Sequence, residues 1–160
     1  MLRKTRWTLI ALFILSNSNS FFGKTIEEIA ENTAPSVVQI VTYDITGAER
    51  GQGSGFFITP QKILTNAHVI EGAYSAEVFS DANYYNKVIV LLEDAYLDLA
   101  IISVGYTDEI PLRIYSSVKL KPGQRVIAIG NPFGLEKTIS DGLISAIRTV
   151  NGHQILQITA

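Results

Sequence analysis

The feature that most limits the fold of this chain is the close spacing of short apolar runs with a two-residue period. Residues 36–43 (SVVQIVTY) alternate as a strand does when one face is buried. Turn residues such as Thr46-Gly47 and Pro60-Gln61 separate such runs, and no long helical pattern intervenes. The sequence therefore predicts an all-β antiparallel barrel or sandwich. Further strands are expected at residues 55–58, 63–64, 76–79, 87–91, 97–104, 111–115, 125–129, 138–147 and 154–158.

Residues 1–20 have the order of segments that is typical of a secretory signal peptide. Arg3, Lys4 and Arg6 precede an apolar run (WTLIALFIL), and the small and polar residues SNSNS follow it. The run is far shorter than the roughly 20 residues that a membrane-spanning helix needs. We expect export and cleavage near Ser20, with an uncleaved membrane anchor as the alternative.

The composition excludes several classes of function. The chain has no cysteine, which rules out disulfides, thiolate zinc sites and a cysteine nucleophile. Loss of residues 1–20 would reduce the 13 Lys and Arg residues to 10, against 15 Asp and Glu. The resulting net charge of −5 leaves no basic patch for nucleic acid or anionic lipid. Residues 21–160 are enough for one ordinary domain held by its own core.

A short helix is predicted ahead of the first strand. Thr25 and Glu28 have the spacing of a capping box, and Pro35 marks the end of the helical pattern. We therefore assign residues 21–35 to an N-terminal helix and linker.

The glycine-rich segment at residues 51–55 (GQGSG) does not fit a nucleotide-binding loop. A dinucleotide fingerprint requires a following helix and a P-loop requires a lysine, whereas the strand-like FFI follows here. Ser54 is a poor nucleophile candidate because Gln52 and Phe56 occupy the positions that are glycine in a nucleophile elbow. The glycines are better explained by a hairpin or by a close approach of two backbones.

His68 and Asp98 are the candidate catalytic residues. His68 follows the strand-like run of ILTNAHVI (63–70), and Asp98 precedes the apolar run LAII. In a structural interpretation, His68 is a hydrogen-bonded core histidine and Asp98 is a strand-end residue that faces water. In a functional interpretation, a buried Asp98 accepts the Nδ1–H of His68 and fixes the tautomer of a general base. The other histidine, His153, fits a surface turn, and we assign it no role.

Five segments together resemble the HtrA/Deg family, trypsin-like serine proteases of the cell envelope. GSGFFI, ILTNAHVI, LDLAII, KPGQRVIAIGNPFG and TISDGLISAI occur in the order and approximate spacing of that family, over about residues 33–160. The resemblance implies two perpendicular β-barrels with an active site between them, and catalytic roles for His68 and Asp98. It also implies a periplasmic or cell-envelope location, unfolded or misfolded polypeptide substrates, no metal or cofactor, and often a homotrimer. Residues 36–113 would form a complete first barrel, and residues 114–160 an incomplete second barrel.

The nucleophile is the main departure from the family pattern. The family's serine lies in a Gly-Asn-Ser-Gly-Gly segment, which is not present in this sequence, and neither are the PDZ domains. Five serines follow Asp98, and none has such glycine neighbours: Ser103, Ser116, Ser117, Ser140 and Ser145. We therefore predict negligible peptidase activity for residues 1–160 alone. The alternative is a non-enzymatic secreted β-domain that binds peptides or a partner chain, in which His68 and Asp98 have no use.

An incomplete second barrel would leave strand edges and an apolar face uncovered. We expect aggregation, disorder after about residue 117, or association with a complementary chain. Seven residues are predicted to lose packing partners: Val126, Ala128, Ile139, Leu143, Ile144, Ile155 and Ile158.

Overall fold

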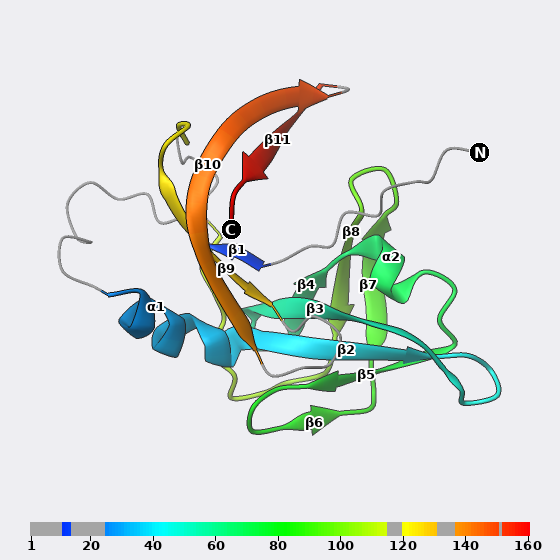
Figure 1. The fold of residues 1–160 in the computed structure, drawn as a ribbon. Helices are drawn as coiled ribbons and strands as arrows, with labels where there is room; N and C mark the ends of the chain where they lie inside the picture. Colours follow the sequence, from blue (N-terminus) through cyan, green and yellow to red (C-terminus); the bar gives the residue numbers. More distant parts are fainter. Residues whose placement is uncertain (1–10, 14–24, 115–119, 131–136, 151) are drawn as a thin grey trace.

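Two curved antiparallel sheets make up most of the computed structural model (Figure 1). The structure describes residues 11–13, 25–114, 120–130, 137–150 and 152–160. Within these ranges the helices are short, and strands dominate, so the prediction of an all-β fold is confirmed. No helix in the described ranges is both long enough and apolar enough to cross a bilayer.

Seven strands form the first sheet in the spatial order β6-β5-β2-β3-β4-β8-β7. All neighbouring pairs are antiparallel, and short turns join the consecutive pairs β2–β3, β3–β4, β5–β6 and β7–β8. The strands are β2 (Val37–Tyr43), β3 (Glu49–Thr59), β4 (Lys62–Thr65), β5 (Ser75–Phe79), β6 (Tyr84–Tyr85), β7 (Ile89–Asp94) and β8 (Leu99–Ser103).

The strand predicted at residues 111–115 is wrong over its described part, because residues 111–114 are irregular. Separate hydrogen bonds hold this segment instead of a strand ladder. The backbone N of Leu112 donates to the Phe57 carbonyl at 2.8 Å, and the Ser36 hydroxyl donates to the Ile110 carbonyl at 2.5 Å. Pro111 has no N–H to donate to a ladder, which is a physical reason for the missing strand.

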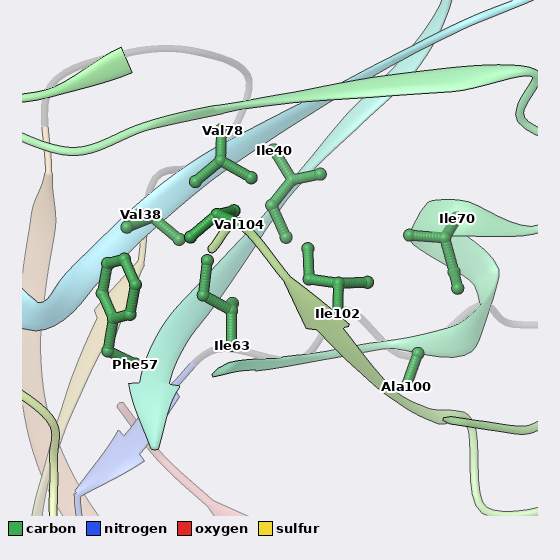
Figure 2. Packing of buried hydrophobic residues seen from close by; sticks show 9 residues of the cluster. All are labelled: Val38, Ile40, Phe57, Ile63, Ile70, Val78, Ala100, Ile102 and Val104. Atoms are coloured by element: carbon green, nitrogen blue, oxygen red, sulfur yellow. The ribbon is translucent and has the colours of Figure 1, made fainter. Parts of the chain in front are cut away.

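The first sheet encloses a core built from alternating residues of its own strands and from the short helix α2 (Ala67–Ile70) (Figure 2). This alternation is the two-residue period seen in the sequence. The pattern is broken in β2, where Val37 and Val38 are both fully buried because Val37 packs in a second cluster on the opposite face. The buried residues of the first core are Val38, Ile40, Phe57, Ile63, Ile70, Val78, Ala100, Ile102 and Val104.

The second sheet has the order β1-β9-β10-β11. Its strands are β1 (Ala11–Phe13), β9 (Arg125–Gly130), β10 (Thr138–Val150) and β11 (His153–Ile158). Strand β1 lies within the predicted signal peptide and pairs antiparallel with residues 127–129 of β9. The remainder of residues 1–24 lies outside the described part of the chain, so the signal peptide stays a prediction.

Helix α1 (Ile26–Thr33) joins the two sheets. Its predicted capping box is present, since the Glu28 amide donates to Thr25 Oγ1 at 3.1 Å and the Thr25 amide donates to Glu28 Oε2 at 2.8 Å. A one-turn 3-10 helix, η1 (Ala34–Ser36), leads from α1 into β2. Ile29 of α1 and Val37 of β2 belong to one buried cluster with the β9 residues Ile127 and Ile129.

The predicted loss of partners in the second sheet is wrong for three of the seven residues. Val126, Ala128 and Ile144 have exposures of 0%, 1% and 0%. Ile139, Leu143 and Ile155 are 42%, 47% and 42% exposed, in line with the prediction. Ile158 is half-buried. On β9, the neighbouring residues Ile127 and Ile129 are buried against α1 and Val37. The far parts of β10 and β11 extend away from that contact (Figure 1).

Candidate active site

Helix α2 carries His68 and packs closely against β3 at Gly53, which has no side chain. A Cβ added at Gly53 would overlap the side chain of Val69, which lies next to His68 in α2. A Cβ at Gly55 would lie 2.7 Å from Ile63 Cγ2. Both glycines lie inside β3, so the predicted hairpin role is wrong. A close backbone approach is present at Gly55, where a Cβ would lie 3.0 Å from the Leu64 carbonyl oxygen, whereas at Gly53 the close neighbour is a side chain.

Asp98 directly precedes β8, the strand that pairs with β4 just before α2. The register opposes Thr65 to Ala100, which brings the start of α2 close to Asp98. Asp98 has a φ of 54°, and among the described residues it is the one non-glycine with positive φ. This left-handed conformation is sterically unfavourable for residues with a side chain, although aspartate tolerates it better than most.

The Asp98 carboxylate faces His68 and makes two hydrogen bonds to it. His68 Nδ1 lies 2.7 Å from Asp98 Oδ2, and the backbone N–H of His68 donates to Asp98 Oδ1 at 2.9 Å. An ionised carboxylate can only accept hydrogen bonds, so Nδ1 carries the proton. Nε2 of the neutral ring is therefore the nitrogen that can accept a proton. This is the hydrogen bond that the functional interpretation of the sequence predicted.

Asn66 is a third member of the site, and sequence reasoning missed it. Its Nδ2 donates to the backbone carbonyl of Asp98 at 2.8 Å and to Asp98 Oδ2 at 3.0 Å. Asn66 is 4% exposed. A buried polar side chain needs hydrogen-bond partners, so the asparagine between apolar segments was the available signal.

The prediction that Asp98 is buried is wrong. The side chains of His68 and Asp98 are 22% and 35% exposed. Asp98 lies ahead of β8 instead of inside the sheet, and its carboxylate is covered from the side of Asn66 and α2. Partial exposure lowers the desolvation cost of this charge.

Two other residues considered from the sequence, Ser54 and His153, lie on strands. Ser54 lies inside β3, is 8% exposed, and its carbonyl accepts a hydrogen bond from Thr65 Oγ1 at 2.8 Å. His153 begins β11 directly after Gly152, so it is a strand residue and not the predicted turn residue, and its side chain is outside the described part. Among the described residues, no group of three or more His, Asp or Glu side chains is placed to hold a metal ion.

The serines that follow Asp98 are distributed over two sheets. Ser103 lies on β8, and Ser140 and Ser145 lie on β10. The Ser145 hydroxyl donates to the Gln157 carbonyl at 2.9 Å across the β10–β11 pair. Ser116 and Ser117 fall outside the described residues.

Sequence comparisons relate the chain to known proteases. The family model of the trypsin-like peptidase domain matches residues 53–160. The chloroplastic protein Protease Do-like 1 of Arabidopsis thaliana is 37% identical over 136 residues, which cover 78% of this chain and 31% of that protein. A probable periplasmic serine endoprotease, DegP-like, of Halomonas elongata is 42% identical over 100 residues, which cover 61% of this chain and 21% of that protein.

The fold comparison agrees with the sequence comparisons. A structure of the HtrA-type protease AlgW with a tripeptide superposes with a TM-score of 0.74 and 25% identity, over 84% of this chain and 46% of that chain. This chain thus spans between 21% and 31% of the length of the two curated relatives above. The chain belongs to the trypsin-like serine proteases of the HtrA type.

Proposed function

We propose that this chain contributes the general base and its orienting carboxylate to a serine endopeptidase. His68 is the base and Asp98 is the carboxylate. The observation that supports the proposal is the 2.7 Å contact between His68 Nδ1 and Asp98 Oδ2, made within an HtrA-type fold. A contact of this kind fixes the imidazole tautomer that a general base requires.

The chemistry follows from that tautomer. A serine Oγ attacks the scissile carbonyl carbon while His68 Nε2 accepts the Oγ proton, and the imidazolium then donates this proton to the leaving amine. Asp98 keeps its hydrogen bond to Nδ1–H and stabilises the imidazolium. Water repeats the sequence on the acyl-enzyme and releases the second product. General-base assistance of this kind contributes about 10²–10⁴-fold to the rate.

We further infer that the nucleophilic serine belongs to a Gly-Asn-Ser-Gly-Gly segment outside residues 1–160. Backbone N–H groups near that serine would form the oxyanion hole. The lack of such a segment among these residues supports this inference. The Ser145 hydroxyl makes a hydrogen bond across the β10–β11 pair, which fits a structural role.

The proposed substrates are unfolded or misfolded polypeptides in the periplasm or cell envelope. A relative from Halomonas elongata is named as a periplasmic endoprotease, and the HtrA-type structure contains a tripeptide. The segment order of residues 1–20 supports export. We also propose a homotrimer, by resemblance to the family.

A fluorophosphonate probe, which reacts with activated serines, tests this proposal. The native protein from its source cells should exceed residues 21–160 in intact mass and should be labelled on one serine. His68→Ala in that protein should reduce the labelling rate by about 10²-fold or more. Residues 1–160 alone should be neither labelled nor active on casein.

Two results would contradict the proposal. A native protein with the mass of residues 21–160 and no labelling would favour the non-enzymatic β-domain that binds peptides or a partner. His68-dependent labelling of residues 1–160 would instead mean that the nucleophile is one of the chain's own serines.

A further inference from the structure

We propose that Asn66 is a positioning residue for the pair formed by His68 and Asp98. This inference rests on the proposed catalytic role of that pair. Asn66 contacts no reacting atom in the mechanism above. It acts on Asp98, and through Asp98 it determines the tautomer of His68.

The position of Asn66 in the chain indicates a specific role. Asn66 is the N-cap residue of α2, with φ −80° and ψ 146°, a position where asparagine usually accepts a hydrogen bond from the first helical amides. Its side chain makes no such capping bond. The amide nitrogen donates to Asp98 instead, 32 residues along the chain.

The chemistry of the two acceptors fixes the orientation of the amide. Nδ2 has two hydrogens, and both of its partners on Asp98, the backbone carbonyl and Oδ2, can only accept. One nitrogen therefore ties the main chain of Asp98 to its own carboxylate. Because Asp98 has a φ of 54°, these two hydrogen bonds from Asn66 also support a backbone conformation that is sterically unfavourable.

The carboxylate is consequently held by three N–H donors. Oδ2 accepts from Asn66 Nδ2 and faces His68 Nδ1, and Oδ1 accepts from the His68 backbone N–H. Without Asn66, the Asp98 backbone would be free to relax and Oδ2 would leave Nδ1. A neutral imidazole without that acceptor prefers the Nε2–H tautomer, whose protonated Nε2 cannot accept the serine proton. The expected consequence of losing Asn66 is therefore a change of tautomer at His68.

Nitrogen-15 NMR of the imidazole rings measures this tautomer directly. In labelled residues 1–160, at a pH where the rings are neutral, His68 should be predominantly Nδ1–H. In Asn66→Ala it should become predominantly Nε2–H. In Asn66→Asp, which keeps the side-chain volume but replaces the donor by a second carboxylate, the same change is expected. His153 provides a second imidazole in every spectrum as a reference.

Asn83→Ala is the matched control. Asn83 Nδ2 donates to Glu109 Oε1 at 3.0 Å, so this substitution also removes a bond from an asparagine to a carboxylate, but away from the pair. His68 should stay Nδ1–H in this variant. Only variants with a dispersed amide spectrum are compared, and if Asn66→Ala does not fold, Asn66→Asp decides.

The outcomes separate this inference from the proposed function. If His68 in the unaltered chain is predominantly Nε2–H, the catalytic pair itself is not formed, and both proposals fail. If His68 is Nδ1–H and remains so in the folded Asn66 variant, the pair stands and the role of Asn66 is overturned. In the intact protease, a positioning role further predicts that Asn66→Asp lowers kcat and leaves KM nearly unchanged.

Discussion

The two sheets obtain their cores in different ways. The first sheet encloses buried side chains that come from its own strands and from α2. In the second sheet, Ile127 and Ile129 are buried against α1 and Val37, which lead into or belong to the first sheet. Farther along the second sheet, Leu143 and Ile155 are 47% and 42% exposed. The core of the first sheet is thus self-supporting, although Ile89 and Leu92 on its edge strand β7 are 64% and 52% exposed. The second sheet depends on the first for part of its burial.

This difference matters for function because the candidate site lies entirely in the self-supporting region. Asn66 and His68 follow β4, and Asp98 precedes β8. The antiparallel pairing of β4 with β8 brings these residues together. The contacts that form the pair involve no residue of the second sheet. We therefore infer that the pair assembles within the first sheet.

The largest expected effect comes from comparing one core deletion in each sheet. Phe57 is 0% exposed and lies edge-on to Tyr85, with ring centroids 6.3 Å apart. Phe57→Ala should lower the free energy of unfolding by about 3–5 kcal/mol. Ile155→Ala, at a residue that is 42% exposed, should cost less than about 1 kcal/mol. Equal losses in denaturant titrations would contradict the difference between the sheets.

A smaller effect is expected from adding a side chain at Gly53, where α2 packs against β3. Gly53→Ala would force its new Cβ into Val69, and such overpacking costs about 1–3 kcal/mol. Gly51→Ala is the control on the same strand, because its Cβ would lie 4.0 Å from the nearest atom, Thr42 Oγ1. Thermal unfolding should show a loss for Gly53→Ala that Val69→Ala restores in the double variant. A loss at Gly51 as large as that at Gly53 would argue against a specific seat for α2.

The connection between the sheets can be weakened at Lys137, directly before β10. Lys137 Nζ lies 2.7 Å from Asp81 Oδ2 and also donates to the Ala34 carbonyl, and its side chain is 15% exposed. Lys137→Met should lower the free energy of unfolding by about 1 kcal/mol, mainly because the hydrogen bond to the Ala34 carbonyl is lost. Asp81→Asn should cost less than about 0.5 kcal/mol because Asp81 is 61% exposed and screened by solvent. If Asp81→Asn costs as much as Lys137→Met in urea titrations, the ion pair itself makes the connection.

The smallest expected effect is a pH dependence inside the first sheet. The hydrogen bond to Glu77 raises the pKa of Tyr43 to about 12 from 10.0, and Tyr43 Oη lies 2.6 Å from Glu77 Oε2. Because the folded pKa is raised, this stabilisation is complete below pH 10 and disappears as the pH approaches 12. The unaltered chain should therefore lose stability between about pH 10 and pH 12. Tyr43→Phe should make this loss smaller, by less than about 1 kcal/mol because the pair is partly exposed to solvent. Tyr74→Phe, at a side chain that is 71% exposed, is the control, and an equal reduction there would exclude a specific role for Glu77.

Sequence alone predicted most strands of the first sheet because most of them bury one face, which imposes a two-residue period. Strand β7 was predicted from its apolar run alone, since residues 89–93 are exposed on both faces. It missed β6, since two residues show no period, and it placed β3 too short because glycines interrupt the apolar pattern. It identified His68 and Asp98, helped by the resemblance to a family. It could not find the hydrogen bonds of Asn66, the exposure of Asp98 or the pairing of β1 with β9, because these depend on contacts between distant segments.

Amide hydrogen exchange of residues 1–160 tests most directly whether the pair forms within a self-supporting first sheet. The His68 amide donates to Asp98 Oδ1 at 2.9 Å, so its exchange rate reports on the pair itself. We predict that this amide and the paired amides of β4 and β8 exchange at least about tenfold more slowly than the paired amides of β10 and β11. Equal rates in both sheets would mean that the chain opens as one unit, and a rapidly exchanging His68 amide would mean that the pair is not formed; either result would contradict this account.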